Sequence, residues 1–147
     1  MKELDGLIAK ATRGEPDAAA FLTGLHRIVD IWDDLIDKDK PVDDAAINAA
    51  FYAALVAIPR NPFYRAHFAL LSPLIESAII DWHTANALEK TGGDDLRTAH
   101  ALRCAGYSVL IMCARIIGGV EWAEEVSLEL RSGQSDWAEY AEKHKVA

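Results

Sequence analysis

Apolar residues recur at helical spacing along almost the whole chain, and no stretch alternates between apolar and polar residues with a period of two. Proline and glycine interrupt this pattern where helices commonly begin and end. The pattern therefore predicts an all-α protein. The chain has 147 residues, no internal repeat and no dividing linker, so we expect one domain, residues 1–147. That domain is predicted to be a single compact helical bundle of about six to seven helices.

The breaks and the capping residues beside them predict the helix boundaries. Pro16 is expected to be the first residue of a long helix, Asp43 to cap the next, and Asn61-Pro62 to open another. Ser72-Pro73 predicts a kink or a fresh start, because proline removes one backbone hydrogen bond. The expected helices cover residues 3–12, 16–37, 44–58, 63–90, 96–117, 121–131 and 136–144.

Two of these helices, near residues 73–90 and 96–117, are apolar nearly all round. Such helices lie inside a bundle or at an oligomer interface. The longest apolar stretches, residues 68–82 and 109–120, are expected to be too short or too polar to span a bilayer. Cys104 and Cys113 fall on the second of them, too far apart for a disulfide bond. The sequence thus favours a cytoplasmic protein with no membrane segment.

The net charge of −8 and the pI near 5.0 argue against a nucleic-acid-binding surface, which needs clustered lysine and arginine. The same charge disfavours binding to anionic membranes. It suits a protein that binds cations or a basic partner.

An acidic stripe is the most specific local feature. Asp30, Asp33, Asp34 and Asp37 share one helix face, and His26 lies one turn earlier. One interpretation is half of a site for Mg²⁺ or Mn²⁺, since hard cations prefer oxygen ligands. If His26 joins the ligands, manganese or zinc is favoured. The other interpretation is a solvated face, because the stripe lies opposite the apolar side of its own helix.

The missing half of such a site is expected from Glu76 and His83, which lie seven positions apart on one face of an apolar helix. Both are expected to be partly buried. Glu76 would complete the metal ligands and His83 is a candidate catalytic base. Alternatively, they form a polar pair that binds a neighbouring arginine or the backbone. Three arginines either clamp a phosphorylated substrate or pair with Glu76, Asp81 or the acidic helix: Arg97, Arg103 and Arg115.

Short motifs add three resemblances. Asp33-Asp34-Leu35-Ile36-Asp37 resembles the DDxxD motif of isoprenoid synthases, in which a helix binds magnesium that holds a diphosphate. The acids on two helices are similar to those of all-helical nucleotide pyrophosphohydrolases, although Glu76 and Asp81 lie on different faces. Residues 32–37, 61–65 and 85–89 together resemble small all-helical proteins of unassigned function encoded in phage or prophage regions.

Two functions follow as hypotheses. The first is a non-enzymatic interaction or assembly protein, phage-derived, that forms a homo-oligomer or binds a protein partner. The alternative is a divalent-metal-dependent hydrolase or lyase that acts on a phosphorylated small molecule or nucleotide. Its metal ligands would be Asp30, Asp33, Asp34, Asp37 and Glu76. No nucleophile motif or phosphate-binding loop is present in the sequence, which leaves open whether the protein is an enzyme.

Overall fold

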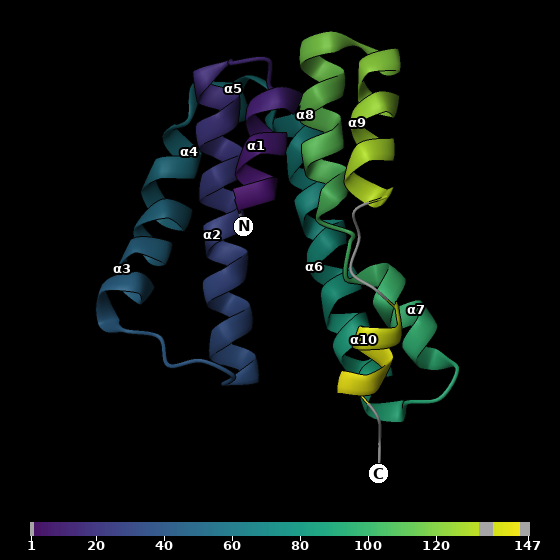
Figure 1. Ribbon diagram of the computed structural model, residues 1–147. Coiled ribbons are helices and arrows are strands. Elements are labelled where there is room, and N and C mark those ends of the chain that lie inside the picture. The colour runs from purple at the N-terminus through teal and green to yellow at the C-terminus, as the bar shows by residue number, and fades with distance from the viewer. Residues whose placement is uncertain (1, 133–136, 145–147) are drawn as a thin grey trace. The chain divides into compact units, whose positions relative to one another are not determined.

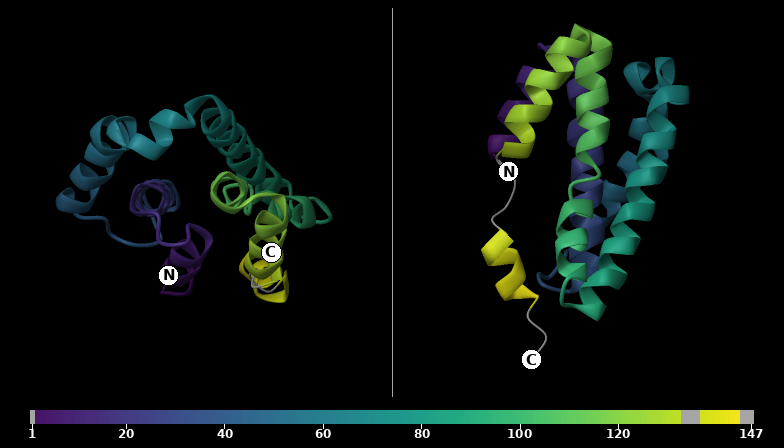
Figure 2. Two further views of the ribbon diagram at one scale, coloured as in Figure 1. Left: turned by 90° about the horizontal axis from the view of Figure 1, so that it is seen from above. Right: turned by 90° about the vertical axis from the view of Figure 1, so that its right-hand side faces the viewer.

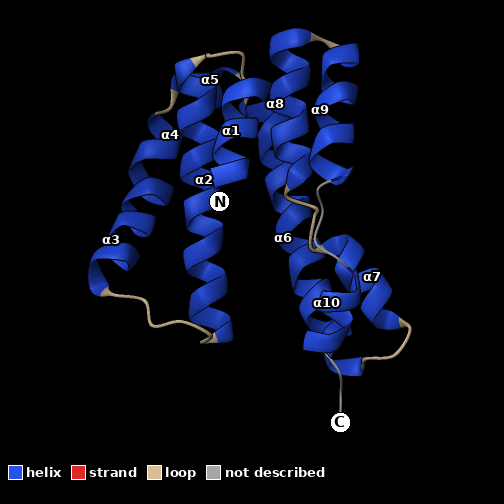
Figure 3. Ribbon diagram, viewed as in Figure 1, coloured by secondary structure: helices blue, strands red, loops and turns tan. Residues whose placement is uncertain are grey.

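A computed structural model describes residues 2–132 and 137–144. Within these residues the secondary structure is helical and contains no strand, which confirms the predicted all-α fold (Figure 3). Contacts divide the chain into two compact units, residues 1–68 and 69–147, and each unit is described by itself. The expectation of one domain stays a prediction.

The first unit is built around its longest helix, α2 (Pro16–Asp37), which contacts each of the other helices of the unit (Figure 1). These are α1 (Lys2–Ala11), α3 (Asp44–Tyr52), the π-helix η1 (Ala53–Ala57), α4 (Ile58–Arg60) and α5 (Pro62–Ala66). α3, η1 and α4 follow one another without a break.

The predicted start signals of this unit are confirmed. Pro16 is the first residue of α2, and the Glu15 side chain caps that helix by accepting from the backbone N–H of Asp17 and Ala18. Asp43 caps α3 by accepting from Ala46 N at 2.8 Å. Each cap satisfies backbone donors that the first turn of a helix leaves without an intrahelical partner.

One capping residue also holds two helices together. Asn61 Oδ1 accepts from Tyr64 N at the start of α5, and Asn61 Nδ2 donates to the carbonyl of Asp17 at 2.8 Å. Beside this bond, the fully buried ring of Phe21 stacks on Tyr64 with ring centres 4.9 Å apart. The start of α2 and α5 therefore form the packed end of the unit.

The second unit contains most of α6 (Phe68–Thr91), which begins at the last residue of the first unit. It continues with α7 (Asp95–Leu102), α8 (Tyr107–Gly118), α9 (Val120–Ser132) and α10 (Trp137–Lys143). α8 and α9 lie side by side as an antiparallel hairpin (Figures 1 and 2). Val109 and Cys113 of α8 and Val126 of α9 are almost completely buried.

Two glycines make the tight turn of this hairpin. Gly119 has a φ of +89°, a conformation that residues with a side chain rarely adopt. A Cβ atom at Gly118 would lie only 2.4 Å from Cδ1 of Trp122. Trp122 therefore packs directly on the Gly118 backbone, and the turn needs glycine at both positions.

Three predicted helix boundaries are wrong. The helix that was expected to stop at Ile58 continues through Pro59 to Arg60, after the π-helix η1. The proline ring clashes with the carbonyl four residues earlier in a regular helix, and the wider π turn relieves this crowding. The fresh start that was one alternative at Ser72-Pro73 lies instead at His67, between α5 and α6, and the other alternative, a kink, stays a prediction. Pro73 sits near the start of α6, where it removes only one backbone bond.

The third wrong boundary concerns residues 96–117, which form two helices rather than one. Hydrogen bonds of the i→i+3 kind run through residues 101–109, for example from Ala105 N to the carbonyl of Leu102 at 3.0 Å. Gly106 in this turn is a poor helix former. Cys104 therefore lies in the turn and Cys113 on α8, and both are buried free thiols. The last predicted helix begins at Asp136, which lies outside the described residues, and α10 covers 137–143.

One segment, Asp95–Gly118, is long and apolar enough to cross a membrane when judged by length and composition alone. The core helices of many soluble proteins meet the same criterion. The turn at residues 103–106 divides this segment into α7 and α8, and 12 residues of α8 span about 18 Å of the roughly 30 Å of a bilayer core. The cytoplasmic location stays a prediction.

Candidate functional site

The acidic stripe of α2 is only partly exposed to solvent. Asp30, Asp33 and Asp34 are half-buried, whereas Asp37 is exposed. On the same half of the helix the large aliphatic residues Val29 and Ile36 are exposed. His26 does extend the stripe by one turn, with Nε2 3.7 Å from Asp30 Oδ2.

The two residues expected to complete a metal site are placed differently from the prediction. Glu76 and His83 on α6 are both exposed, so the expected partial burial is wrong. The ring of His83 instead lies against Trp82, with ring centres 5.6 Å apart. Within the described residues, no group of three or more His, Cys, Asp or Glu side chains is arranged to hold a metal ion. A site formed by the α2 aspartates with Glu76 would draw on both units, and it stays a prediction.

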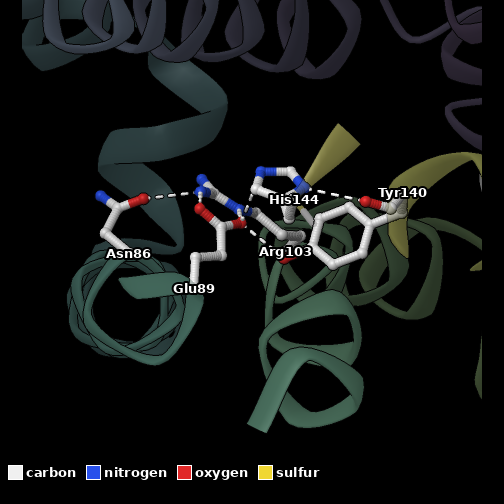
Figure 4. Close-up of polar contacts among 5 residues, drawn as sticks. All are labelled: Asn86, Glu89, Arg103, Tyr140 and His144. Atoms are coloured by element: carbon white, nitrogen blue, oxygen red, sulfur yellow. Dashed lines mark hydrogen bonds and ion pairs between the residues drawn. The ribbon is translucent and has the colours of Figure 1, made fainter. Parts of the chain in front are cut away.

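A different polar cluster in the second unit is well ordered by its contacts (Figure 4). Arg103 binds Glu89 through two parallel bonds, from Nε at 2.8 Å and from Nη2 at 2.6 Å. Nη2 also donates to Asn86 Oδ1 at 2.6 Å. From α10, the Tyr140 hydroxyl donates to Glu89 Oε1 at 2.5 Å, and His144 Nε2 lies 3.6 Å from the same oxygen.

The cluster keeps the Glu89 carboxylate charged. Burial raises the pKa of Glu89, but the hydrogen bonds from Arg103 and Tyr140 and the charges of Arg103 and His144 lower it more. The net pKa lies below the ordinary value of 4.5. Burial and the bond to Glu89 raise the pKa of Tyr140 to about 12, so its hydroxyl remains a donor at neutral pH. A general base or acid needs a pKa closer to the working pH, and neither group has one.

Rings and a cation surround this cluster where α10 meets α7. His100 lies 4.8 Å from the Tyr140 ring centre, and the guanidinium carbon of Arg97 lies 4.6 Å from the centre of Trp137. The Tyr140 and His144 rings are 4.3 Å apart. These contacts attach α10 to the end of α6 and to α7, so we interpret the cluster as structural.

Sequence reasoning expected Arg103 and Arg97 to act as phosphate clamps or to pair with Glu76, Asp81 or the acidic helix. The structure pairs Arg103 with Glu89 and places Arg97 over Trp137. Glu89 was not a candidate, because nothing local in the sequence links it to Arg103, fourteen positions later. Burial raises the pKa of the Cys113 thiol to about 12, consistent with a core residue rather than a nucleophile.

The structure also presents an apolar surface that sequence reasoning missed. α3 and η1 contain no buried residue. Their large side chains point outward: Phe51 and Tyr52 are each 61% exposed, and Leu55 is 71% exposed. Phe51 and Leu55 are one turn apart and so lie on one side of the helix. We call this surface the α3–η1 face.

A signal for this face was present in the sequence. Residues 45–59 contain no charged side chain and form the longest uncharged stretch of the chain. The sequence pattern predicted a helix over residues 44–58 and assigned it no particular face. Only the structure shows that its largest residues remain exposed.

Comparisons with known proteins identify no relative: no family model, no curated protein and no solved structure matches the chain. The resemblances to phage-encoded proteins and to the isoprenoid-synthase motif therefore stay predictions.

Proposed function

We propose that this protein is a non-enzymatic interaction or assembly protein that binds another protein through the α3–η1 face. The observation that carries the proposal is the exposure of Phe51, Tyr52 and Leu55 on a helical segment without charge. Soluble proteins rarely expose contiguous apolar surface unless a partner covers it.

The composition of the face supports a protein partner. Aromatic residues are enriched at protein interfaces and charged residues are depleted at their centres. Phe51 and Tyr52 supply large rigid surfaces with few rotatable bonds, and the Tyr52 hydroxyl can find a polar partner at the edge. The alanines around them allow a second backbone to approach closely.

The test places a photo-reactive amino acid at Leu55 and looks for covalent adducts in cells that make the protein. The matched control places the same group at Leu128 of α9, which is 74% exposed against 71% for Leu55. We expect protein adducts from position 55 and few from position 128. Equal labelling at both positions, or no adduct at position 55, would contradict the proposal.

The second candidate function is the predicted metal-dependent hydrolase or lyase. The half-burial of Asp33 and Asp34 favours it, because carboxylates withdrawn from water gain from a cation beside them. Exposed Glu76 and the tightly bound Arg103 offer it little support. The interaction function is therefore the better supported of the two.

A further inference from the structure

We infer that the partner of the α3–η1 face is the same face of a second copy of this chain, with the two segments antiparallel. This inference rests on the proposed function and specifies its partner. It is carried by the distribution of charge at the two ends of the face.

The ends of the face have opposite charge. Asp43 and Asp44 lie at its start, and Arg60 and Arg65 lie just beyond its end. All four side chains are exposed, and the residues between Asp44 and Arg60 are uncharged. When two copies lie antiparallel, the acidic end of each meets the basic end of the other. A parallel arrangement would instead place acid on acid and base on base.

This pattern is self-complementary, as an interface with two-fold symmetry requires. The ion pair between the two ends occurs twice. Because both copies use the same face, the assembly stops at a dimer. The helix macrodipoles of the two segments also oppose each other in this arrangement. A second copy supplies the complementary order of charges by symmetry.

The length of the segment fits the same pairing. The segment from Asp44 to Arg60 is about 24 Å long at 1.5 Å per residue, and Tyr52 lies at its midpoint. With Asp44 opposite Arg60 of the second copy, Tyr52 of one copy lies opposite Tyr52 of the other, at the two-fold axis.

The experiment measures the dimer dissociation constant of the full chain by sedimentation equilibrium. We expect a reversible dimer for the wild type. Asp44→Lys and Arg60→Glu should each raise the dissociation constant about tenfold, because each replaces two attractive pairs by two repulsive ones. The double variant Asp44→Lys/Arg60→Glu should return to within about threefold of wild type, since its pairs are attractive again.

Matched controls change the net charge equally on exposed positions of α9. Glu124→Lys and Arg131→Glu should leave the dissociation constant unchanged. The double variant also tests whether the substituted chains fold. If it dimerises, neither substitution alone can have prevented folding. A wild type that stays monomeric at every concentration overturns the inference. A double variant that dimerises no better than the single variants overturns the antiparallel arrangement.

Cross-linking from Leu55 separates this inference from the proposed function. An adduct of two copies from the purified protein supports both. An adduct to a different protein in cells, with a monomeric purified chain, overturns self-association and leaves the proposed function standing. An adduct only to residues 69–147 of the same chain overturns both.

Discussion

At the residue scale, the packing of Trp122 on Gly118 makes a sharp prediction. Gly118→Ala introduces a Cβ atom 2.4 Å from Trp122 Cδ1, so the indole or the backbone must move. We expect the free energy of unfolding to fall by about 1–3 kcal/mol, as for other overpacked sites. Denaturant unfolding measures the change.

Gly106→Ala is the matched control for this substitution. Gly106 has a φ of −60°, and a Cβ atom there would meet nothing within 4 Å. We expect it to be neutral or stabilising by up to about 1 kcal/mol, because alanine restricts the unfolded chain. Equal destabilisation by both substitutions would show that the Trp122 contact does not decide the effect.

A second residue-scale prediction concerns Glu89 and pH. Its pKa is lower in the folded chain than the ordinary 4.5, so the carboxylate stabilises the fold above pH 4.5. That contribution is lost as the pH falls through the folded-state pKa. Glu89→Gln should lower the free energy of unfolding by about 1–3 kcal/mol at pH 7 by leaving Arg103 without its carboxylate.

Unfolding of wild type and Glu89→Gln at pH 7 and pH 3 measures this linkage. The difference between the two proteins should be smaller at pH 3 than at pH 7, because the pH then lies below the ordinary pKa of 4.5 and the stabilisation is lost as it falls toward the lower pKa of the folded chain. Glu124→Gln removes an exposed carboxylate of α9 as the control and should have little effect at either pH. A difference that stays constant with pH would mean that the Glu89 charge is not responsible.

At the element scale, the acidic stripe of α2 gives the test of metal binding. If Asp30, Asp33, Asp34 and Asp37 hold Mg²⁺ or Mn²⁺, the ion stabilises the folded chain by about 2.7 kcal/mol at a hundredfold excess over its dissociation constant. Thermal melts with and without the ion, at equal ionic strength, measure this. The gain should be lost in Asp33→Asn/Asp34→Asn.

Glu124→Gln/Glu125→Gln is the control, because it removes two exposed carboxylates outside the stripe and should keep the gain. Melts that do not respond to either ion would rule out the metal hypothesis.

The elements also show which parts of the fold local sequence can predict. Pro16, Asp43 and Asn61 marked their helix starts correctly, because a cap acts on donors within three residues of itself. The turn at residues 103–106 was missed because a single glycine such as Gly106 is often tolerated inside a helix and does not by itself predict a break. The bond between Arg103 and Glu89 was missed because the two residues lie fourteen positions apart, and no periodicity reports a contact of that kind. The exposure of Leu55 was missed for a similar reason: an uncharged helical stretch suits a core as well as an interface.

At the scale of the whole molecule, self-association would link stability to protein concentration. If the α3–η1 face forms a dimer that only the folded chain can make, each tenfold rise in concentration stabilises the dimer by about 1.4 kcal/mol. We therefore expect the melting temperature to rise by a few degrees for each tenfold increase.

Leu55→Ser should abolish this dependence by removing an apolar side chain from the centre of the face. Leu128→Ser, an equally exposed leucine on α9, should retain it. Differential scanning calorimetry over a concentration series gives both results with the intact chain. A melting temperature that does not change with wild-type concentration, or changes equally in Leu55→Ser, would contradict a dimer through this face, because mass action requires stability to follow the population of dimer.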